Sequence, residues 1–340
     1  MNTIGKFLAA FCAGLFVVTA VFALFVFNFD RSSFTAETYQ RAFARGDFYN
    51  KVPTILADVI TSSETDQGKL PDLMRGMSKE AWEDFFRTLL PPETLKVMGD
   101  DVLNSTFAYI NLQADSAQLN LTPLKTSLTS DTGVQAILTL LGTQPQCSLF
   151  QIAQMTINAL SGGKIEFCNP PAELYPVLMP LIQGQLQFTT AAMPDQVTII
   201  SAPPQNDPRQ RLKTLRLFMR LSPILPLLFL MGLTIFAVRS LKGWLSWWGI
   251  SFFITGSIAF VMSLLGAPLV GAILERILVN RMPVYLPVIL LDYTSDFAAV
   301  MVGTLLIPIL WQGLVLAFIG LAMSLSSLLV GYLSAKKPAR

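Results

Sequence analysis

Long apolar runs alternate with polar stretches along the chain. The runs cover residues 7–29, 221–238, 243–265 and 309–335. An α-helix rises about 1.5 Å per residue, so each run is long enough to cross a hydrocarbon layer of about 30 Å. The first run is also longer than the roughly 7–15 apolar residues of a cleaved signal peptide. The pattern predicts four transmembrane helices, of which the first, over residues 1–29, is an uncleaved signal anchor.

The polar stretch of residues 30–208 has mainly helical periodicity. Its clearest helix follows Ser78, a typical N-cap residue, and stops before Pro91. Apolar residues on one face of this helix recur every three or four positions: Trp82, Phe85, Phe86, Leu89 and Leu90. Only residues 164–168 and 196–201 have an extended pattern, and they could pair as a small ribbon. The predicted fold class is therefore an all-α integral membrane protein, with four transmembrane helices and a predominantly α-helical extracytoplasmic domain.

A shorter segment near residues 266–300 separates the third and fourth apolar runs. Its apolar residues form one stripe: Leu269, Val270, Ile273, Leu274, Ile277 and Leu278. This pattern favours a helix that lies in the membrane interface or packs beneath the polar domain. The predicted organisation is a signal anchor at 1–29, an extracytoplasmic helical domain at 30–208 and a three-span membrane domain at 209–340, with the interfacial segment inside the last.

Charge is scarce and unevenly distributed. Charged residues make up 14% of the chain, whereas soluble domains have about 25%. Residues 30–207 hold 19 acidic and 11 basic residues, and the remainder of the chain is basic although the net charge is only +2. Basic residues beside apolar runs are typical of contact with anionic lipid headgroups. We expect the lipid bilayer and its anionic lipids as partners, and no nucleic acid.

The charges around the first run predict the orientation of the chain. Lys6 precedes this run, and the charges that follow it cancel: Asp30, Arg31, Glu37 and Arg41. The positive-inside rule then places the N-terminus in the cytoplasm, and four spans return the C-terminus to the same side. The basic residues within 209–220 oppose this orientation, because they would lie outside.

The cysteines favour the same orientation. Cys12 lies within the first apolar run and is expected to pack as a small apolar residue. Cys147 and Cys168 lie in the polar stretch and can form a disulfide, which persists only in an oxidising compartment. The alternative is a pair of buried free thiols. Together with the charges, they predict a multi-pass protein of the cell membrane with both termini cytoplasmic and residues 30–208 extracytoplasmic.

Two surface features stand out beside the apolar runs. Arg209, Lys213, Arg216 and Arg220 follow one another at spacings of four, three and four residues, which places them on one helical face. We expect this face to contact anionic lipid or, alternatively, the protein's own acidic domain or a partner. Trp244, Trp247 and Trp248 begin the third run, where indole rings typically anchor a helix at the headgroup level.

The sequence contains no recognisable catalytic constellation. Histidine is absent, which excludes Ser-His-Asp and Cys-His catalysis as well as histidine-ligated metals. The chain also lacks a phosphate-binding loop, a CxxC pair and a GxSxG elbow. We therefore predict a protein that is not an enzyme, with no catalytic, cofactor-binding or metal-binding residues and no cofactor.

Two resemblances bear on function. The order of one span, a large exported domain, two spans, a short outer segment and a last span resembles the permease subunits of mechanotransmission-type ABC complexes. That resemblance implies a cytoplasmic ATPase partner, but the loop at 239–242 is too short for the coupling helix of such permeases.

The sequence is also similar to uncharacterised bacterial four-span envelope proteins. This similarity rests on short motifs in the polar stretch and the third run: Tyr39, Phe48-Tyr49, Val52-Pro53, Leu90-Pro91-Pro92-Glu93, Cys147, Cys168-Asn169-Pro170-Pro171, Ala237-Val238-Arg239-Ser240 and Trp247-Trp248-Gly249. It implies an integral membrane protein of a bacterial cell envelope. We expect the extracytoplasmic domain to bind a partner protein, an envelope polymer or a small ligand in a structural, sensing or scaffold role, with a protein partner or a homo-oligomer as its assembly. The alternative is the permease-like subunit.

Overall fold

The computed structural model describes residues 3–62, 77–148, 150–154, 157, 168–281 and 288–335. The chain divides into two compact units. The first, called the span unit below, comprises Met1–Ala42, Pro203–Ile277 and Asp296–Arg340. The second, called the domain unit, comprises Phe43–Ala202 and Leu278–Ser295.

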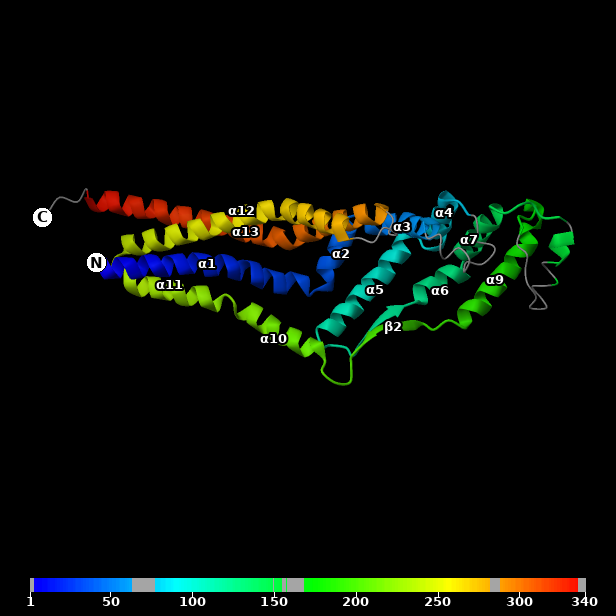
Figure 1. Cartoon of the computed structure of the whole chain (residues 1–340), viewed down its shortest axis with the longest axis horizontal. Helices are drawn as coiled ribbons and strands as arrows, with labels where there is room; N and C mark the ends of the chain where they lie inside the picture. The colour runs from blue at the N-terminus through cyan, green and yellow to red at the C-terminus, as the bar shows by residue number, and fades with distance from the viewer. Residues whose placement is uncertain are drawn as a thin grey trace. The chain divides into compact units, whose positions relative to one another are not determined.

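Helices make up the span unit (Figure 1). They are α1 (Thr3–Ser33), α10 (Pro208–Leu221), α11 (Ile224–Ala237), α12 (Leu241–Arg281) and α13 (Val288–Ala335), and the short α2 (Ala36–Arg45) follows α1. All of them except α2 and the basic α10 are apolar over most of their length. Within the described residues, four stretches are long and apolar enough to cross a membrane: Gly5–Ser33, Pro208–Ala237, Leu241–Gly266 and Phe297–Tyr332. The prediction of four such helices is confirmed.

Small side chains allow these helices to approach closely. Helices α1 and α11 pack through a buried cluster that includes Ala9, Ala20 and Leu233. On α12, a methyl group added to Gly256 would overlap the backbone of Ala317 on α13. Such close backbone contact through small residues is the usual packing of transmembrane helices.

Helix α12 extends beyond the third apolar span. The span was expected to end near 265, and the stretch apolar enough to cross a membrane ends at Gly266, but the helix continues without interruption to Arg281. Pro268 lies inside this helix. The apolar stripe of residues 269–278 has the same 3.6-residue period as the span before it, so the stripe continues the helix instead of starting a new one.

The domain unit is also mainly helical. Its elements are α3 (Phe48–Ser62), α4 (Lys79–Leu89), α5 (Pro92–Ile110), β1 (Ser116–Asn120), α6 (Thr122–Thr129), α7 (Asp131–Gly142), the 3₁₀ turn η3 (Ala172–Leu174), α9 (Tyr175–Ala191) and β2 (Gln196–Ser201). Its core is the buried cluster Ala57, Met77, Trp82, Phe85, Ala136, Leu140 and Leu141. The predominantly helical character predicted for this part of the chain is confirmed.

Helix α4 shows how the sequence directs this core. Ser78 caps the helix, and its hydroxyl oxygen accepts a hydrogen bond of 3.2 Å from the backbone N–H of Ala81. Trp82 is only 3% exposed and stacks on Phe86 with ring centroids 5.4 Å apart. The predicted N-cap and apolar face of this helix are both confirmed.

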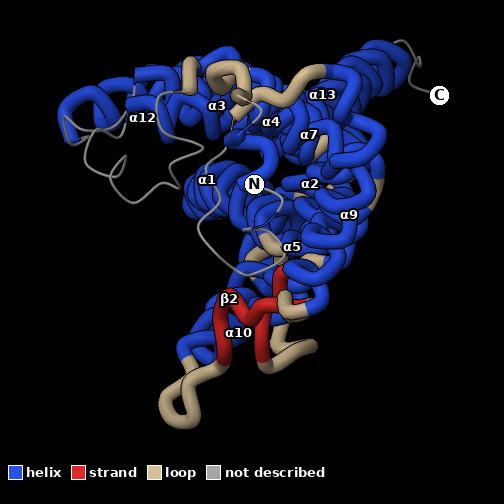
Figure 2. Tube along the Cα trace, turned by 90° about the vertical axis from the view of Figure 1, so that its right-hand side faces the viewer, coloured by secondary structure: helices blue, strands red, loops and turns tan. Residues whose placement is uncertain are grey.

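The two strands pair antiparallel, with Ser116 opposite Ser201 and Asn120 opposite Gln196 (Figure 2). The prediction that residues 196–201 form a strand is confirmed. The partner of this strand in the described part of the chain is β1. The predicted pairing with residues 164–168 is not tested, because residues 164–167 lie outside the described part of the chain. Strand β1 has the sequence Ser-Ala-Gln-Leu-Asn, which lacks the β-branched and aromatic residues that mark a strand in a sequence.

Candidate functional site

A buried carboxylate at the end of the first apolar helix is the centre of the candidate site. Asp30 lies three residues before the end of α1, and its side chain is only 4% exposed. It accepts a hydrogen bond of 2.7 Å from Nε of Arg216 and another of 2.8 Å from Nε of Arg220. The two arginines are four residues apart on α10, so both can turn toward α1.

The two arginines differ in their exposure. The Arg216 side chain is 13% exposed, and its guanidinium lies 4.3 Å from the centre of the Phe34 ring. The Arg220 side chain is 59% exposed. One carboxylate therefore neutralises two cations only in part, and the cluster of Asp30, Arg216 and Arg220 carries one net positive charge, with Arg220 as its accessible member.

A pair of amide side chains includes a residue of α1 that lies two positions before Asp30, about half a helical turn deeper. Asn28 is 2% exposed, and its Nδ2 donates a hydrogen bond of 2.7 Å to Oε1 of Gln312 on α13. Nε2 of Gln312 in turn donates to Oδ1 of Asn28 over 3.2 Å. Polar side chains in apolar helices are costly unless they are paired, so this pair fixes the register of α1 against α13.

Arg209 is held within its own helix end. Asp207 caps α10, and its carboxylate accepts from the Arg209 backbone N–H over 2.9 Å and from the Arg209 Nη2 over 2.7 Å. The hydrogen bond from the Arg209 guanidinium is the main reason that the pKa of Asp207 is lowered. Arg209 itself is buried, with 7% of its surface exposed.

The predicted basic face is thus divided by the structure. Of its four residues, Arg209 is paired with Asp207 and Arg216 with Asp30, whereas Lys213 is exposed and Arg220 is both paired and exposed. From the sequence, Asp30 is only one of the charges that cancel after the first apolar run. A carboxylate at the end of an apolar run is the signal that could have drawn attention to Asp30. No local pattern identifies its partners, however, because Arg216 and Arg220 lie 186 and 190 residues away in the sequence.

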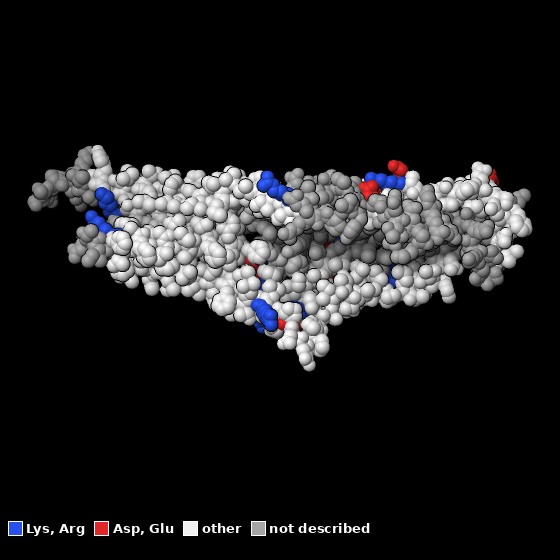
Figure 3. Space-filling view, viewed as in Figure 1, with Lys and Arg blue, Asp and Glu red and all other residues white. Residues whose placement is uncertain are grey.

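The tryptophans at the start of α12 pack against neighbouring helices. Trp248 donates a hydrogen bond of 3.1 Å from its indole N–H to the Thr234 hydroxyl on α11. Trp244 and Trp248 are in contact, with ring centroids 5.3 Å apart, and Trp247 packs beside the α1–α11 cluster. Figure 3 shows a long uncharged surface on the span unit, with Lys and Arg atoms at the end where α12 begins.

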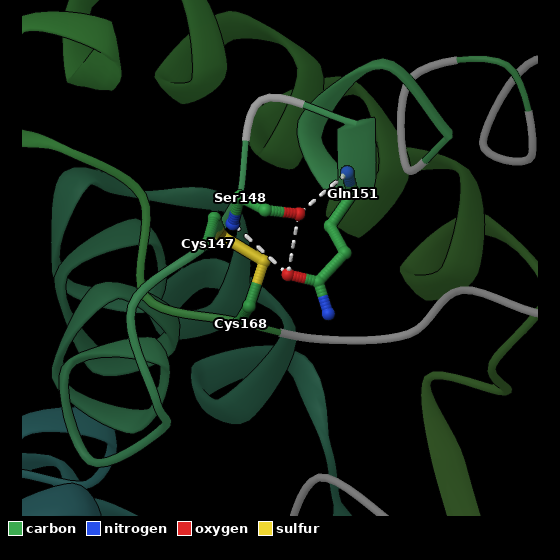
Figure 4. The surroundings of a disulfide bond; sticks show 4 residues. All are labelled: Cys147, Ser148, Gln151 and Cys168. Carbon is green, nitrogen blue, oxygen red and sulfur yellow. Dashed lines mark hydrogen bonds between the residues drawn. A yellow bond between two sulfur atoms is a disulfide. The ribbon is translucent and has the colours of Figure 1, made fainter.

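The domain unit contains the predicted disulfide, which joins Cys147 and Cys168 (Figure 4). The flanking backbones pair as well, because the Cys147 N–H donates to the Asn169 carbonyl over 2.9 Å. Beside the bond, Oε1 of Gln151 accepts from both the backbone N–H and the hydroxyl of Ser148, over 2.9 and 3.0 Å. Cys12 remains a free thiol, as expected.

No cluster of three or more His, Cys, Asp or Glu side chains that could hold a metal ion occurs in the described part of the chain. No protein-family model, curated protein or solved structure matches this chain.

Proposed function

We propose that this chain is a multi-pass protein of a bacterial cell membrane that holds a helical binding domain on the outer surface and acts by binding rather than by catalysis. The observation that carries this proposal is the disulfide, which lies in the domain unit and outside the four apolar stretches. Such a bond is stable in an oxidising compartment and is rare in a reducing cytosol. The domain unit has its own aromatic core, which is what an independent binding module requires.

Basic residues support cytoplasmic termini. Lys6 stands at the start of α1, Arg239 lies within the short turn between α11 and α12, and Lys242 lies in the first turn of α12. Positive residues in short loops are retained on the cytoplasmic side. With α1 entering from that side, the residues that follow Asp30 lie outside, in agreement with the compartment that the disulfide needs.

Labelling with a membrane-impermeant maleimide tests this orientation. Full-length protein in intact spheroplasts should label at Cys147 and Cys168 after reduction. A Ser240→Cys variant that lacks those two cysteines should label only after lysis. The reverse pattern would refute the orientation, and recovery of the chain from the soluble fraction would refute membrane insertion.

The binding role is tested by cross-linking the full-length protein in native membranes and identifying what is attached to residues 43–202. An exported protein or a cell-wall fragment is the expected result. Turnover of an envelope substrate that a single substitution abolishes would refute a role in binding alone.

The second candidate is a permease-like subunit of a transport complex. Helices α12 and α13 each contribute residues to both units, so each is a continuous element through which a movement can be transmitted. Against it, only Val238–Ser240 separate α11 from α12, which leaves no room for a coupling helix. Stoichiometric co-purification of a cytoplasmic ATPase would favour this candidate over the binding role.

A further inference from the structure

The apolar helices of the span unit enclose a groove that opens toward their outer surface. It has a volume of about 260 Å³ and is lined by residues of all four spans, among them Ala20, Ala23 and Phe27 of α1, Pro226 and Leu227 of α11, and Leu316 of α13. The methyl side chains of Ala20 and Ala23 create the space. A second hollow of about 400 Å³ shares Leu24 and Leu316 with this groove.

The groove is chemically suited to hydrocarbon. Every residue that lines it is apolar, so it offers water no side-chain hydrogen-bond partner. Apolar cavities of this kind stay dry and accept apolar guests. In a membrane-spanning bundle, the available guest is the acyl chain of a lipid.

The same groove ends beside the positive cluster. Phe27 on its α1 side lies three residues, or about one helical turn, before Asp30. Pro223 on its other side lies three residues after Arg220. The cluster of Asp30, Arg216 and Arg220 has one net positive charge, and the exposed Arg220 is the member nearest the surface.

We propose that this groove is a binding site for one anionic phospholipid, with an acyl chain between α1 and α11 and the phosphate on Arg220. The inference rests on the membrane insertion proposed above. A guanidinium presents several N–H donors in a planar fork that matches phosphate oxygens, and Asp30 occupies only part of this fork on Arg220. The uncompensated charge favours an anionic headgroup over a zwitterionic one.

Native mass spectrometry of the full-length protein in mild detergent tests this site. Phosphatidylglycerol and phosphatidylcholine with identical acyl chains are titrated separately. The wild-type chain should bind phosphatidylglycerol more tightly. Arg220→Gln should weaken that binding about fivefold, the effect of one surface cation, and should weaken phosphatidylcholine binding less, because the choline cation offsets the charge of its phosphate. Arg211→Gln removes the same charge from the same helix and is the matched control.

The groove itself is tested by filling it. Leu227 lines the groove and is 61% exposed, so Leu227→Trp should occupy the space without disturbing the packed core, and should weaken binding of both lipids. Leu228 is 53% exposed on the same helix and does not line the groove, so Leu228→Trp is the control. Melting temperatures of all four variants show whether each remains folded.

Three results would overturn this site: equal affinity of the wild type for the two lipids, equal effects of Arg211→Gln and Arg220→Gln, or a dimer without bound lipid that Leu227→Trp dissociates. The last result would assign the groove to a helix of a second copy. Carbonate extraction distinguishes the two proposals. A chain that stays in the membrane pellet but shows no lipid preference disproves only the lipid site, whereas a soluble chain disproves membrane insertion as well.

Discussion

The ion pairs of Asp30 give the sharpest test of how the span unit is held together. Asp30→Asn removes the charge and keeps the size of a side chain that is 4% exposed. Arg216, at 13% exposure, then loses its buried counter-charge, and breaking a buried pair from one side costs about 3–5 kcal/mol. Arg220 is more than half exposed, so its pair adds only about 0–1 kcal/mol.

The expected loss of stability is at the lower end of the range for a buried pair, because Arg216 keeps its contact with the Phe34 ring. We expect Asp30→Asn to lower the free energy of unfolding by about 3 kcal/mol. The assay is denaturant unfolding of the full-length protein in mixed micelles, followed by tryptophan fluorescence.

A double-mutant cycle isolates the pair from other effects of the substitution. Once Arg216→Gln has removed the buried cation, adding Asp30→Asn should cost less than it does alone, with a coupling energy of about 2 kcal/mol. Glu37→Gln is the control, because the Glu37 side chain is 77% exposed and its carboxylate lies as far as 3.9 Å from the Arg41 Nε. Removing this weak surface ion pair should lower the free energy of unfolding by less than about 0.5 kcal/mol. Additive effects of the two substitutions, or a cost no larger than that of the control, would refute the reasoning.

Three further predictions concern other parts of the chain. Replacing Cys147 and Cys168 by serine should destabilise the domain unit by about 3 kcal/mol, because the disulfide joins residues 21 positions apart and so restricts the unfolded chain. An unchanged melting temperature would contradict this. Gly256→Leu should lower the melting temperature sharply, because its side chain would overlap the backbone of α13, whereas Gly303→Leu, at a glycine with open space around it, should not. Burial, the Asp100 charge and a hydrogen bond to that carboxylate raise the pKa of Tyr49 from 10.0 to about 12. The stability that neutral Tyr49 contributes is therefore complete below pH 10 and should be lost as the pH rises through 12. An absorbance titration should show one tyrosine that ionises later than the others, and ionisation of Tyr49 at pH 10 would disprove the prediction.

The elements that the sequence predicted correctly are those with a strong local cause. Four apolar runs became four helices because a backbone in an apolar surrounding must satisfy its hydrogen bonds internally. Helix α4 begins at Ser78 because a hydroxyl can accept from the free N–H groups of the first turn. The third apolar stretch ends at Gly266, close to the expected 265, whereas the helix that contains it continues to Arg281.

The features that the sequence did not predict depend on distant contacts. Strand β1 is polar and short, and only its pairing with β2, some 80 residues later, makes it a strand. Asn28 and Gln312 are 284 residues apart, so neither could indicate the other. The same holds for the pairs that Arg216 and Arg220 form with Asp30.

The basic face of α10 shows how such contacts change a functional argument. From the sequence, the four cations form one surface with one shared role, in contact with anionic lipid or, alternatively, with the acidic domain or a partner. Within the described residues, the buried guanidinium groups of Arg209 and Arg216 are received by the carboxylates of Asp207 and Asp30, because an unpaired buried charge is prohibitively costly. These two carboxylates withdraw Arg209 and Arg216 from the surface and leave Lys213 and Arg220 exposed. Asp30 therefore does more than join α1 to α10: by pairing with two arginines at once, it leaves one net positive charge in the cluster, and the proposed lipid site depends on this charge.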